Sequence, residues 1–153
     1  MTNEKTKVRL ALYQPDMPSN TGTMMRMCAC LGVSLDVIEP CGFLMTDAKL
    51  RRACMDYIDY LDYKRHSCFE EFTSNIGQRR LILLTTKSKT SYYDFAFKPD
   101  DVIMVGRESA GVPDEVHHTA SACLTIPMIE NARSLNVAIS ASLVLGEALR
   151  QTR

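Results

Sequence analysis

The sequence predicts an α/β fold in which helices cover both faces of a parallel sheet. Residues 81–84 and 102–105 are continuous apolar runs, as expected for strands that are buried on both faces. Segments with the pattern of strands also alternate along the chain with segments that have the pattern of helices, which is typical of doubly wound domains. The length of 153 residues suits a single domain, residues 1–153, with one hydrophobic core.

The N-terminal part of the chain predicts two strands. Residues 8–13 and 33–38 each alternate large apolar side chains with small or polar ones, which is the pattern of a strand. Pro15 and Pro18 follow the first of these strands and end it, because proline has no backbone N–H to donate to a neighbouring strand.

A helix is predicted between these two strands. Either Ser19 or Asn20 can cap its N-terminus, since both side chains can accept a hydrogen bond from a free backbone N–H group. The helix runs to about Leu31. Gly32 ends it, because glycine readily adopts the left-handed conformation that is common just after a helix.

Shorter elements are predicted in the middle of the chain. Asp47 can cap a short helix, residues 60–64 form a short strand, and residues 68–76 form a helix. Basic side chains occur in and after the short helix. They are either candidates for contact with phosphate groups or a solvated charged face without a function, and they are Lys49, Arg51, Arg52, Lys64, Arg65 and His66.

The C-terminal half of the chain completes the predicted sheet. Residues 81–84, 102–105 and 124–126 are apolar strands. Residues 88–99 form a loop, and its aromatic side chains need at least partial burial, namely Tyr92, Tyr93, Phe95 and Phe97.

The last predicted helix is apolar around most of its circumference. Ser134, Leu135 and Asn136 open it, and it runs to about Arg150. Asn136 either caps this helix or orients the loop before it. One face of a small domain cannot bury so many apolar side chains. The composition of the helix therefore predicts a homodimer in which it forms the interface, with the first helix near Met24 and Met27 as its neighbour.

Charge and hydropathy exclude several classes of protein. Lys and Arg total 18 and Asp and Glu total 18, so the net charge of +0 argues against nonspecific coating of nucleic acid. No apolar run reaches the roughly 18 residues that a membrane-spanning helix needs. Residues 1–9 are polar and charged, unlike a secretory signal. We therefore expect a cytoplasmic protein with no part in a membrane.

The cysteines do not predict a metal site. The chain has six of them, at positions 28, 30, 41, 54, 68 and 123, and no pair has the C-x-x-C spacing of many zinc ligands. Cys28 and Cys30 would also point in different directions on a helix. Because no secretory signal is expected, we predict buried free thiols in a reducing compartment and no metal.

The stretch after residues 102–105 predicts a small-molecule pocket. The strand ends at Gly106, and a glycine leaves room for a ligand to approach the backbone. A second strand ends at Ile126-Pro127-Met128, and the last helix begins soon afterwards. Two strand ends and a helix start, close together in sequence, predict one pocket made largely of main-chain groups.

Three motifs then occur in order. They are residues 18–26 (PSNTGTMMR), Gly106-x-Glu108-x-x-Gly111 followed by Ile126-Pro127-Met128, and Ser134-Leu135-Asn136-Val137. Together they resemble the signature motifs of the SPOUT methyltransferases, which methylate RNA, and the resemblance covers residues 8–151. It implies a parallel-sheet α/β/α fold with a C-terminal trefoil knot. Periodicity alone would predict a plain open sheet, because threaded chains are almost absent among folds.

The resemblance also implies a reaction. The short chain, Ile38-Glu39-Pro40 and Leu50-Arg51-Arg52-Ala53 look most like the family members that methylate the ribose 2'-hydroxyl of the wobble nucleotide of tRNA, a cytidine or uridine. The implied methyl donor is S-adenosyl-L-methionine, and the implied partner is tRNA. The donor contacts carry over to Leu84, Gly106, Ile126 and Ser134, with Thr85, Met128 and Leu135 as neighbours. Apolar members of this set would hold the adenine, and main-chain groups would read its edge.

Arg26, Asn20 and Glu108 are the catalytic candidates. Arg26 matches the arginine of the first family motif, which has been considered as a base toward the ribose hydroxyl. A guanidinium stays protonated at neutral pH, so it is better suited to stabilise an alkoxide or to anchor a phosphate. Asn20 positions a loop or the substrate, or only caps the first helix. Glu108 fixes its loop, binds the substrate, or is a solvated acid.

Other functions have weaker support. A different tRNA position, ribosomal RNA, or a noncatalytic RNA-binding role would fit the same fold. A hydrolase would use Ser109 as nucleophile with His117 or His118 as base, but Arg107 stands where the G-x-S-x-G motif requires its first glycine. Close relatives often have proline at the position of Arg107, so details of RNA docking are expected to differ here.

Overall fold

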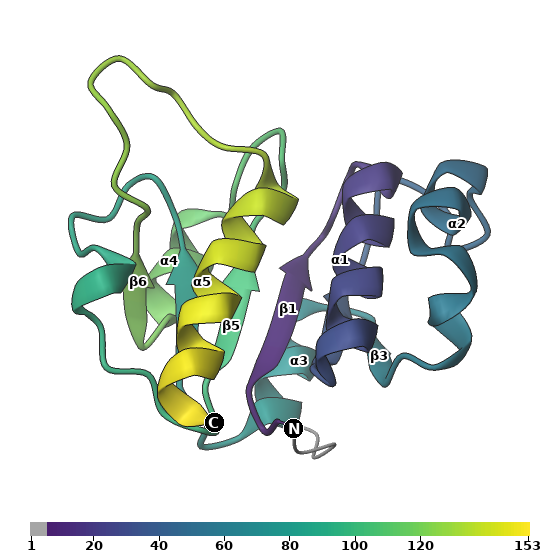
Figure 1. Cartoon of the computed structure of the whole chain (residues 1–153), viewed down its shortest axis with the longest axis horizontal. Coiled ribbons are helices and arrows are strands. Elements are labelled where there is room, and N and C mark those ends of the chain that lie inside the picture. The colour runs from purple at the N-terminus through teal and green to yellow at the C-terminus, as the bar shows by residue number, and fades with distance from the viewer. Residues whose placement is uncertain (1–5) are drawn as a thin grey trace.

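The computed structural model describes residues 6–153. Its sheet has six strands in the order β3-β2-β1-β5-β4-β6, and every pair of neighbouring strands is parallel. This confirms the predicted parallel sheet, which Figure 1 shows. The strands are β1 (Arg9–Tyr13), β2 (Ser34–Ile38), β3 (Tyr63–His66), β4 (Leu81–Leu84), β5 (Val102–Val105) and β6 (Ala122–Leu124).

Helices cover the sheet on both faces. Side chains of α1, α2 and α5 pack on one face, whereas side chains of α3 and α4 pack on the other. The result is the α/β/α layering that the sequence predicts. The helices are α1 (Pro18–Leu31), α2 (Ala48–Cys54), α3 (Phe69–Ile76), α4 (Asp114–Thr119) and α5 (Val137–Thr152), with 3-10 turns η1 (Met55–Asp59) and η2 (Tyr92–Asp94).

The strands distribute their side chains between two cores. In β1, Leu10 and Leu12 pack beneath α1 and α5, whereas Ala11 and Tyr13 pack on the side of α3. This alternation follows from the pleat of a strand. Leu10 is fully buried, and burial of one leucine side chain contributes about 2 kcal/mol to folding.

Helix α1 begins differently from the prediction. Its N-cap is Met17, which makes no side-chain capping bond, and Pro18 is the first helical residue. Ser19 and Asn20 therefore lie inside the first turn, and the prediction that one of them caps the helix is wrong. Proline suits the first helical position because its φ is already helical and its missing N–H would have no partner there. Gly32 ends the helix with φ 69, as predicted.

The remaining differences concern short elements. Asp47 caps α2 through the backbone N–H groups of Lys49 and Leu50, as predicted. Strands β3 and β6 are shifted by two or three residues from the predicted ranges. Helix α4 was not predicted, because in its polar sequence only Val116 is buried and one apolar anchor gives no helical period.

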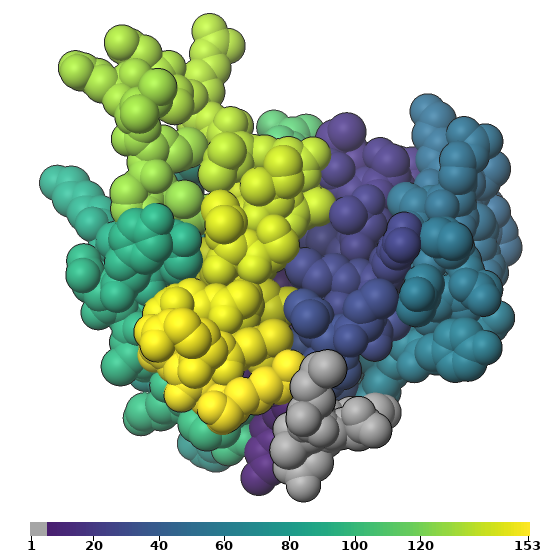
Figure 2. Space-filling model, viewed as in Figure 1, coloured from purple at the N-terminus to yellow at the C-terminus, as the bar shows by residue number. Residues whose placement is uncertain are grey.

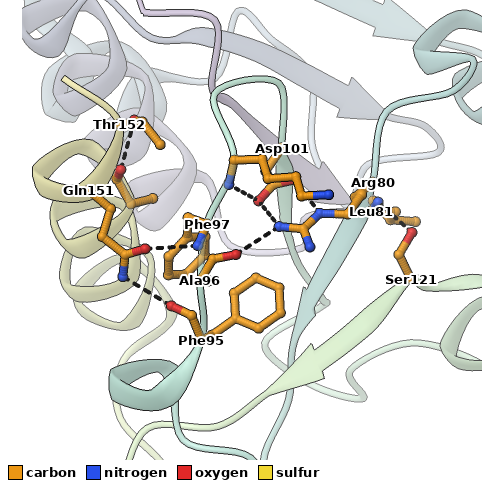
Figure 3. A network of polar contacts seen from close by, with 11 residues as sticks. Arg80, Leu81, Phe95, Ala96, Phe97, Asp101, Ser121, Gln151 and Thr152 are labelled. Carbon is orange, nitrogen blue, oxygen red and sulfur yellow. Dashed lines mark hydrogen bonds and ion pairs between the residues drawn. The ribbon is translucent and has the colours of Figure 1, made fainter.

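The loop between β4 and β5 is fixed against the end of α5. Gln151 accepts a hydrogen bond from the backbone N–H of Phe97 at 2.8 Å and donates one to the carbonyl of Phe95 at 3.0 Å (Figure 3). Arg80 pairs with Asp101 at 2.6 Å. Of the aromatic side chains in this loop, Tyr92 and Phe97 are buried and Phe95 is half-buried, as predicted, but Tyr93 is 66% exposed.

Candidate active site

The carboxyl ends of three neighbouring strands surround a cavity of about 560 Å³. Its walls come from the loops after β4, β5 and β6 and from the start of α5. The segment 125–136 that joins β6 to α5 projects from this edge of the molecule (Figure 1). Ligands of parallel α/β folds bind at the carboxyl ends of the strands, and this volume suits a small molecule.

Every residue that was predicted to contact the methyl donor lines this cavity. The set comes from the end of β4 and from the loops after β4, β5 and β6, and it comprises Leu84, Thr85, Gly106, Ile126, Met128, Ser134 and Leu135. Sequence reasoning missed further wall residues, among them Lys87, His117 and Ser140. Lys87 continues the loop after β4 and could have been inferred, whereas His117 lies in the unpredicted helix α4.

Gly106 has a structural role that differs from the predicted one. A Cβ on Gly106 would lie 2.8 Å from the carbonyl carbon of Gly111. The loop between them is a tight turn, in which the N–H of Arg107 donates to the carbonyl of Gly111 at 3.1 Å and the N–H of Gly111 donates to the carbonyl of Arg107 at 2.9 Å. Glycine at 106 is therefore required for the loop to close on itself, before any ligand approaches.

The side chain of Arg107 braces the same turn. Its Nε donates to the carbonyl oxygen of Gly111 at 3.0 Å, and its guanidinium lies 5.6 Å from the centre of the Tyr13 ring. The arginine thus ties the loop after β5 to the end of β1.

Glu108 joins this loop to the one between β1 and α1. Its Oε2 accepts a hydrogen bond from the N–H of Asp16 at 3.3 Å, and its own N–H donates to Asp16 Oδ1 at 3.2 Å. The hydroxyl of Ser109 donates to Asp16 Oδ2. These hydrogen bonds show that Glu108 fixes its loop, which is one of the roles predicted for it. They also show that Ser109 is bonded to a carboxylate and not to a histidine, which argues against the hydrolase.

The carboxyl groups of Glu108 and Asp16 have pKa values that are shifted in opposite directions. Burial, followed by the hydrogen bond with Asp16, raises the pKa of Glu108 to about 7. The same hydrogen bond with Glu108, helped by Ser109, lowers the pKa of Asp16. Two carboxyl groups in contact titrate as a pair, and the proton that they share is mainly on Glu108 and is lost as pH rises through about 7.

Asn20 and Asn136 form a second link at the cavity. Asn136 Oδ1 accepts hydrogen bonds from the N–H groups of Ala138 at 2.8 Å and Ile139 at 3.2 Å, so this residue caps α5. Its Nδ2 donates to Asn20 Oδ1 at 3.0 Å. Both side chains line the cavity and also a shallow groove between α1 and α5. Sequence reasoning named both residues but did not pair them.

Arg26 lies away from the cavity of its own chain. It is exposed on α1, where its guanidinium is 5.6 Å from the centre of the Tyr57 ring, and it does not line the cavity. The predicted catalytic set is therefore divided, since Asn20 and Glu108 reach the cavity and Arg26 does not.

The basic residues proposed for phosphate contact differ in accessibility. His66 is fully buried, and its Nε2 lies 2.8 Å from Asp36 Oδ1, so the prediction is wrong for this residue. Asp36 also binds Arg9 at 2.8 Å, which completes a polar cluster beneath α3. Arg65 pairs with Glu39 at the surface. The side chains of Lys49, Arg51, Arg52 and Lys64 are exposed.

The cysteines of the chain are free thiols with different exposure. Cys28 and Cys54 are buried, and Cys41 and Cys123 are partly buried. Cys30 and Cys68 are exposed, so the prediction of burial is wrong for these two, which lie on the outer side of α1 and at the start of α3. Within residues 6–153, no group of three or more potential metal ligands is present, and no helix is long and apolar enough to span a membrane.

The chain is similar to proteins that are named as tRNA methyltransferases. It is 55% identical to a Beijerinckia indica protein named tRNA (cytidine(34)-2'-O)-methyltransferase, over 93% of this chain and 90% of that one. An Escherichia coli (strain K12) protein of the same name is 36% identical over 94% of this chain and 93% of its own.

Solved structures of RNA methyltransferases superpose on this chain. A structure described as giving structural insights into the 2-OH methylation of C/U34 on tRNA superposes with a TM-score of 0.90, at 36% identity, over 94% of this chain and 95% of that chain. An AdoMet-bound rRNA methyltransferase from Sinorhizobium meliloti is 23% identical with a TM-score of 0.86, and it covers 98% of this chain and 58% of that chain. The SpoU rRNA Methylase family matches residues 7–146. The resemblance read from the motifs is thereby confirmed, and the chain belongs to the SpoU methylase family.

Proposed function

We propose that this chain transfers a methyl group from S-adenosyl-L-methionine to the ribose 2'-hydroxyl of nucleotide 34, a cytidine or uridine, in tRNA. The observation that carries the proposal is the 55% identity to the Beijerinckia indica enzyme, which spans 93% of this chain and is named for this reaction. Similarity of that extent leaves no large part of either chain unmatched. A cytoplasmic location is part of this proposal, since tRNA is the proposed substrate.

The cavity suits the methyl donor. Leu84, Ile126 and Leu135 provide apolar walls for the adenine, while the turn at Gly106 presents backbone groups. The donor is consumed in the reaction and supplies a methyl group that is already activated on a sulfonium. The protein then has to hold the reacting groups in line and to help the weakly acidic hydroxyl lose its proton. Asn20, which Asn136 fixes, is placed to orient the substrate at the cavity edge.

A homodimer would complete this site. Helices α1 and α5 lie side by side on one face of the molecule (Figure 2), and the groove between them is lined by Thr23, Met27 and Ile139. Ile139 is 52% exposed and Leu143 is 41% exposed, so apolar surface remains for a partner. Met24 lies within the chain's own core, so Met27 is the methionine left for the interface.

Dimerisation also gives Arg26 a role. The groove shares Asn20 and Asn136 with the donor cavity, so a second chain seated on α1 and α5 adjoins the cavity. We propose that Arg26 serves the donor bound by the partner subunit. There it stabilises the developing alkoxide or anchors the neighbouring phosphate.

Nucleoside mass spectrometry on cellular tRNA tests the proposed function. We expect a strain that lacks this gene to lose 2'-O-methylation at nucleotide 34, and the wild-type gene to restore it. Loss of a methyl group at another tRNA position or in ribosomal RNA would assign a different substrate. Unchanged methylation of all RNA, with donor binding retained, would point to a noncatalytic RNA-binding protein.

A further inference from the structure

Ribose methylation requires a group that accepts the proton of the 2'-hydroxyl. The guanidinium of Arg26 cannot fill this role near neutral pH, because it stays protonated. Few other side chains at the donor cavity can accept a proton. The titratable or charged residues that line it within residues 6–153 are Lys87, Arg107, Glu108 and His117.

We propose that Glu108 of the chain that holds the methyl donor accepts this proton. The inference rests on the proposed function and adds a residue role to it. Glu108 lines the donor cavity, in the turn between Gly106 and Gly111 that forms part of the cavity wall. A general base has to lie within hydrogen-bonding reach of the proton it removes, and Glu108 lies on the wall of the cavity that is proposed to hold the donor.

The two oxygens of Glu108 have different surroundings. Oε2 is held by the N–H of Asp16, whereas Oε1 is buried and has no hydrogen-bond partner. Most buried polar atoms in proteins have a partner, so a buried oxygen without one calls for a reason. Because Oε1 has neither a partner nor accessible surface in the ligand-free protein, a substrate hydroxyl reaches it once the Glu108 side chain turns into the cavity that it lines.

The neighbours of Glu108 set its proton affinity. Asp16, on the loop between β1 and α1, contacts the Glu108 carboxyl directly and raises its pKa. Arg107 is directed to Gly111 and Tyr13, while Lys87 and His117 reach the cavity from the β4 loop and from α4. Burial is the largest cause, and together with the contact to Asp16 it raises the pKa of Glu108 to about 7. A base titrating near the working pH combines sufficient basicity with a sufficient ionised fraction.

The step conserves atoms and charge. The 2'-oxygen forms a bond to the methyl carbon while the carbon–sulfur bond breaks, and the electrons of that bond stay on sulfur, which becomes a neutral thioether. The hydroxyl proton moves to Oε1 of Glu108. The carboxylate and the sulfonium are thus neutralised together, and the proton leaves to water after the product dissociates.

Titration of the ligand-free protein tests the proton affinity apart from activity. With carbon-13 in the glutamate carboxyl groups, the resonance that disappears in Glu108→Gln is that of Glu108. We expect its midpoint near pH 7, and we expect Asp16→Asn to move it toward the ordinary glutamate value of 4.5. A midpoint at the ordinary value in the wild-type protein would overturn the proposal.

Single-turnover methylation of tRNA tests the role itself. The wild-type rate should rise with pH and level off above about pH 7, and Asp16→Asn should shift that rise to lower pH. Glu108→Gln, which keeps the shape and the bonds to Asp16, should lower the rate about 100-fold to 10,000-fold at unchanged donor affinity. The matched control is Glu70→Gln, because Glu70 is exposed on α3, and it should keep the wild-type rate.

The outcomes separate this inference from the proposed function. Wild-type protein that methylates no tRNA at any pH would overturn both. Wild-type protein that methylates nucleotide 34, together with an equally active Glu108→Gln, would overturn only the role of Glu108. The same holds if Glu108→Gln loses donor binding in proportion to its rate, since the residue would then only support the loop.

Discussion

Gly106 shows how a single residue limits what the cavity wall tolerates. We expect Gly106→Ala to destabilise the protein by about 1–3 kcal/mol, because the added methyl group meets backbone atoms of Gly111 that cannot move aside cheaply. Urea unfolding measures this change. Gly146→Ala is the control: a Cβ at this exposed position in α5 meets nothing within 4 Å, so it should stabilise the protein by about 0.5–1 kcal/mol. Equal effects of the two substitutions would contradict the packing described for the turn.

Glu108 makes stability depend on pH in a defined direction. Its pKa is raised from 4.5 to about 7, so the folded state binds this proton more tightly than the unfolded state. The stabilisation that protonated Glu108 gives the folded state is therefore complete below pH 4.5, and it is lost as pH rises through about 7. Asp16, with its lowered pKa, acts in the opposite sense but in a more acidic range.

Replacement of Glu108 by glutamine should remove this dependence. We expect the melting temperature of Glu108→Gln to gain on that of the wild-type protein between about pH 5 and about pH 8, since the variant has no carboxylate to repel Asp16. Calorimetric scans at both pH values measure the difference. Parallel pH dependence of the two proteins would show that the carboxyl groups do not share a proton.

At the scale of elements, the sequence predicted helix ends correctly where a single residue determines them. Asp47 caps α2 and Gly32 ends α1, because each outcome depends on a single side chain or its absence. Prediction failed where neighbours compete, as at α1, where Pro18 takes the first helical position and moves the cap to Met17. It also failed for α4, whose only described buried residue, Val116, owes its position to tertiary packing.

Helix α5 should carry the dimer. Leu143 is 41% exposed on it, and we expect Leu143→Glu to convert a dimer at micromolar concentration into monomers, because an unpaired buried carboxylate costs about 3–5 kcal/mol. Light scattering reports the assembly. Tyr60→Glu is the control, since Tyr60 is 75% exposed and lies beyond η1, outside the groove. A wild-type monomer, or a dimer that survives Leu143→Glu, would refute the assignment of the interface.

At the scale of the whole molecule, motif order predicted residues that line one cavity. Leu84, Gly106, Ile126 and Ser134 are distant in sequence. They meet because β4, β5 and β6 end at one edge of the sheet, where α5 also begins. Arg26 does not line this cavity, and its proposed place in the site depends on a second chain, which one sequence does not reveal. The trefoil knot stays a prediction that family membership supports, because strand order alone does not describe threading.

A site shared between subunits makes a prediction about mixtures. Arg26→Ala should bind the methyl donor but transfer slowly, and Ser140→Trp should block the cavity, which Ser140 lines from α5. Mixed dimers then contain one site with an open cavity and an intact Arg26 from the partner. We expect methylation to recover when native mass spectrometry shows mixed dimers. Mixed dimers that stay inactive would mean that each chain acts on its own donor.

The position of the methyl group on tRNA is the most direct test of the account. Purified protein, the methyl donor and tRNA from a strain lacking this gene would be combined, and the digested tRNA mapped by mass spectrometry. The account predicts one new methyl group, on the ribose of nucleotide 34. It also predicts that Arg26→Ala lowers transfer about 100-fold to 1,000-fold while donor binding is kept. A methyl group on a base or on another nucleotide, or full transfer by Arg26→Ala, would contradict it.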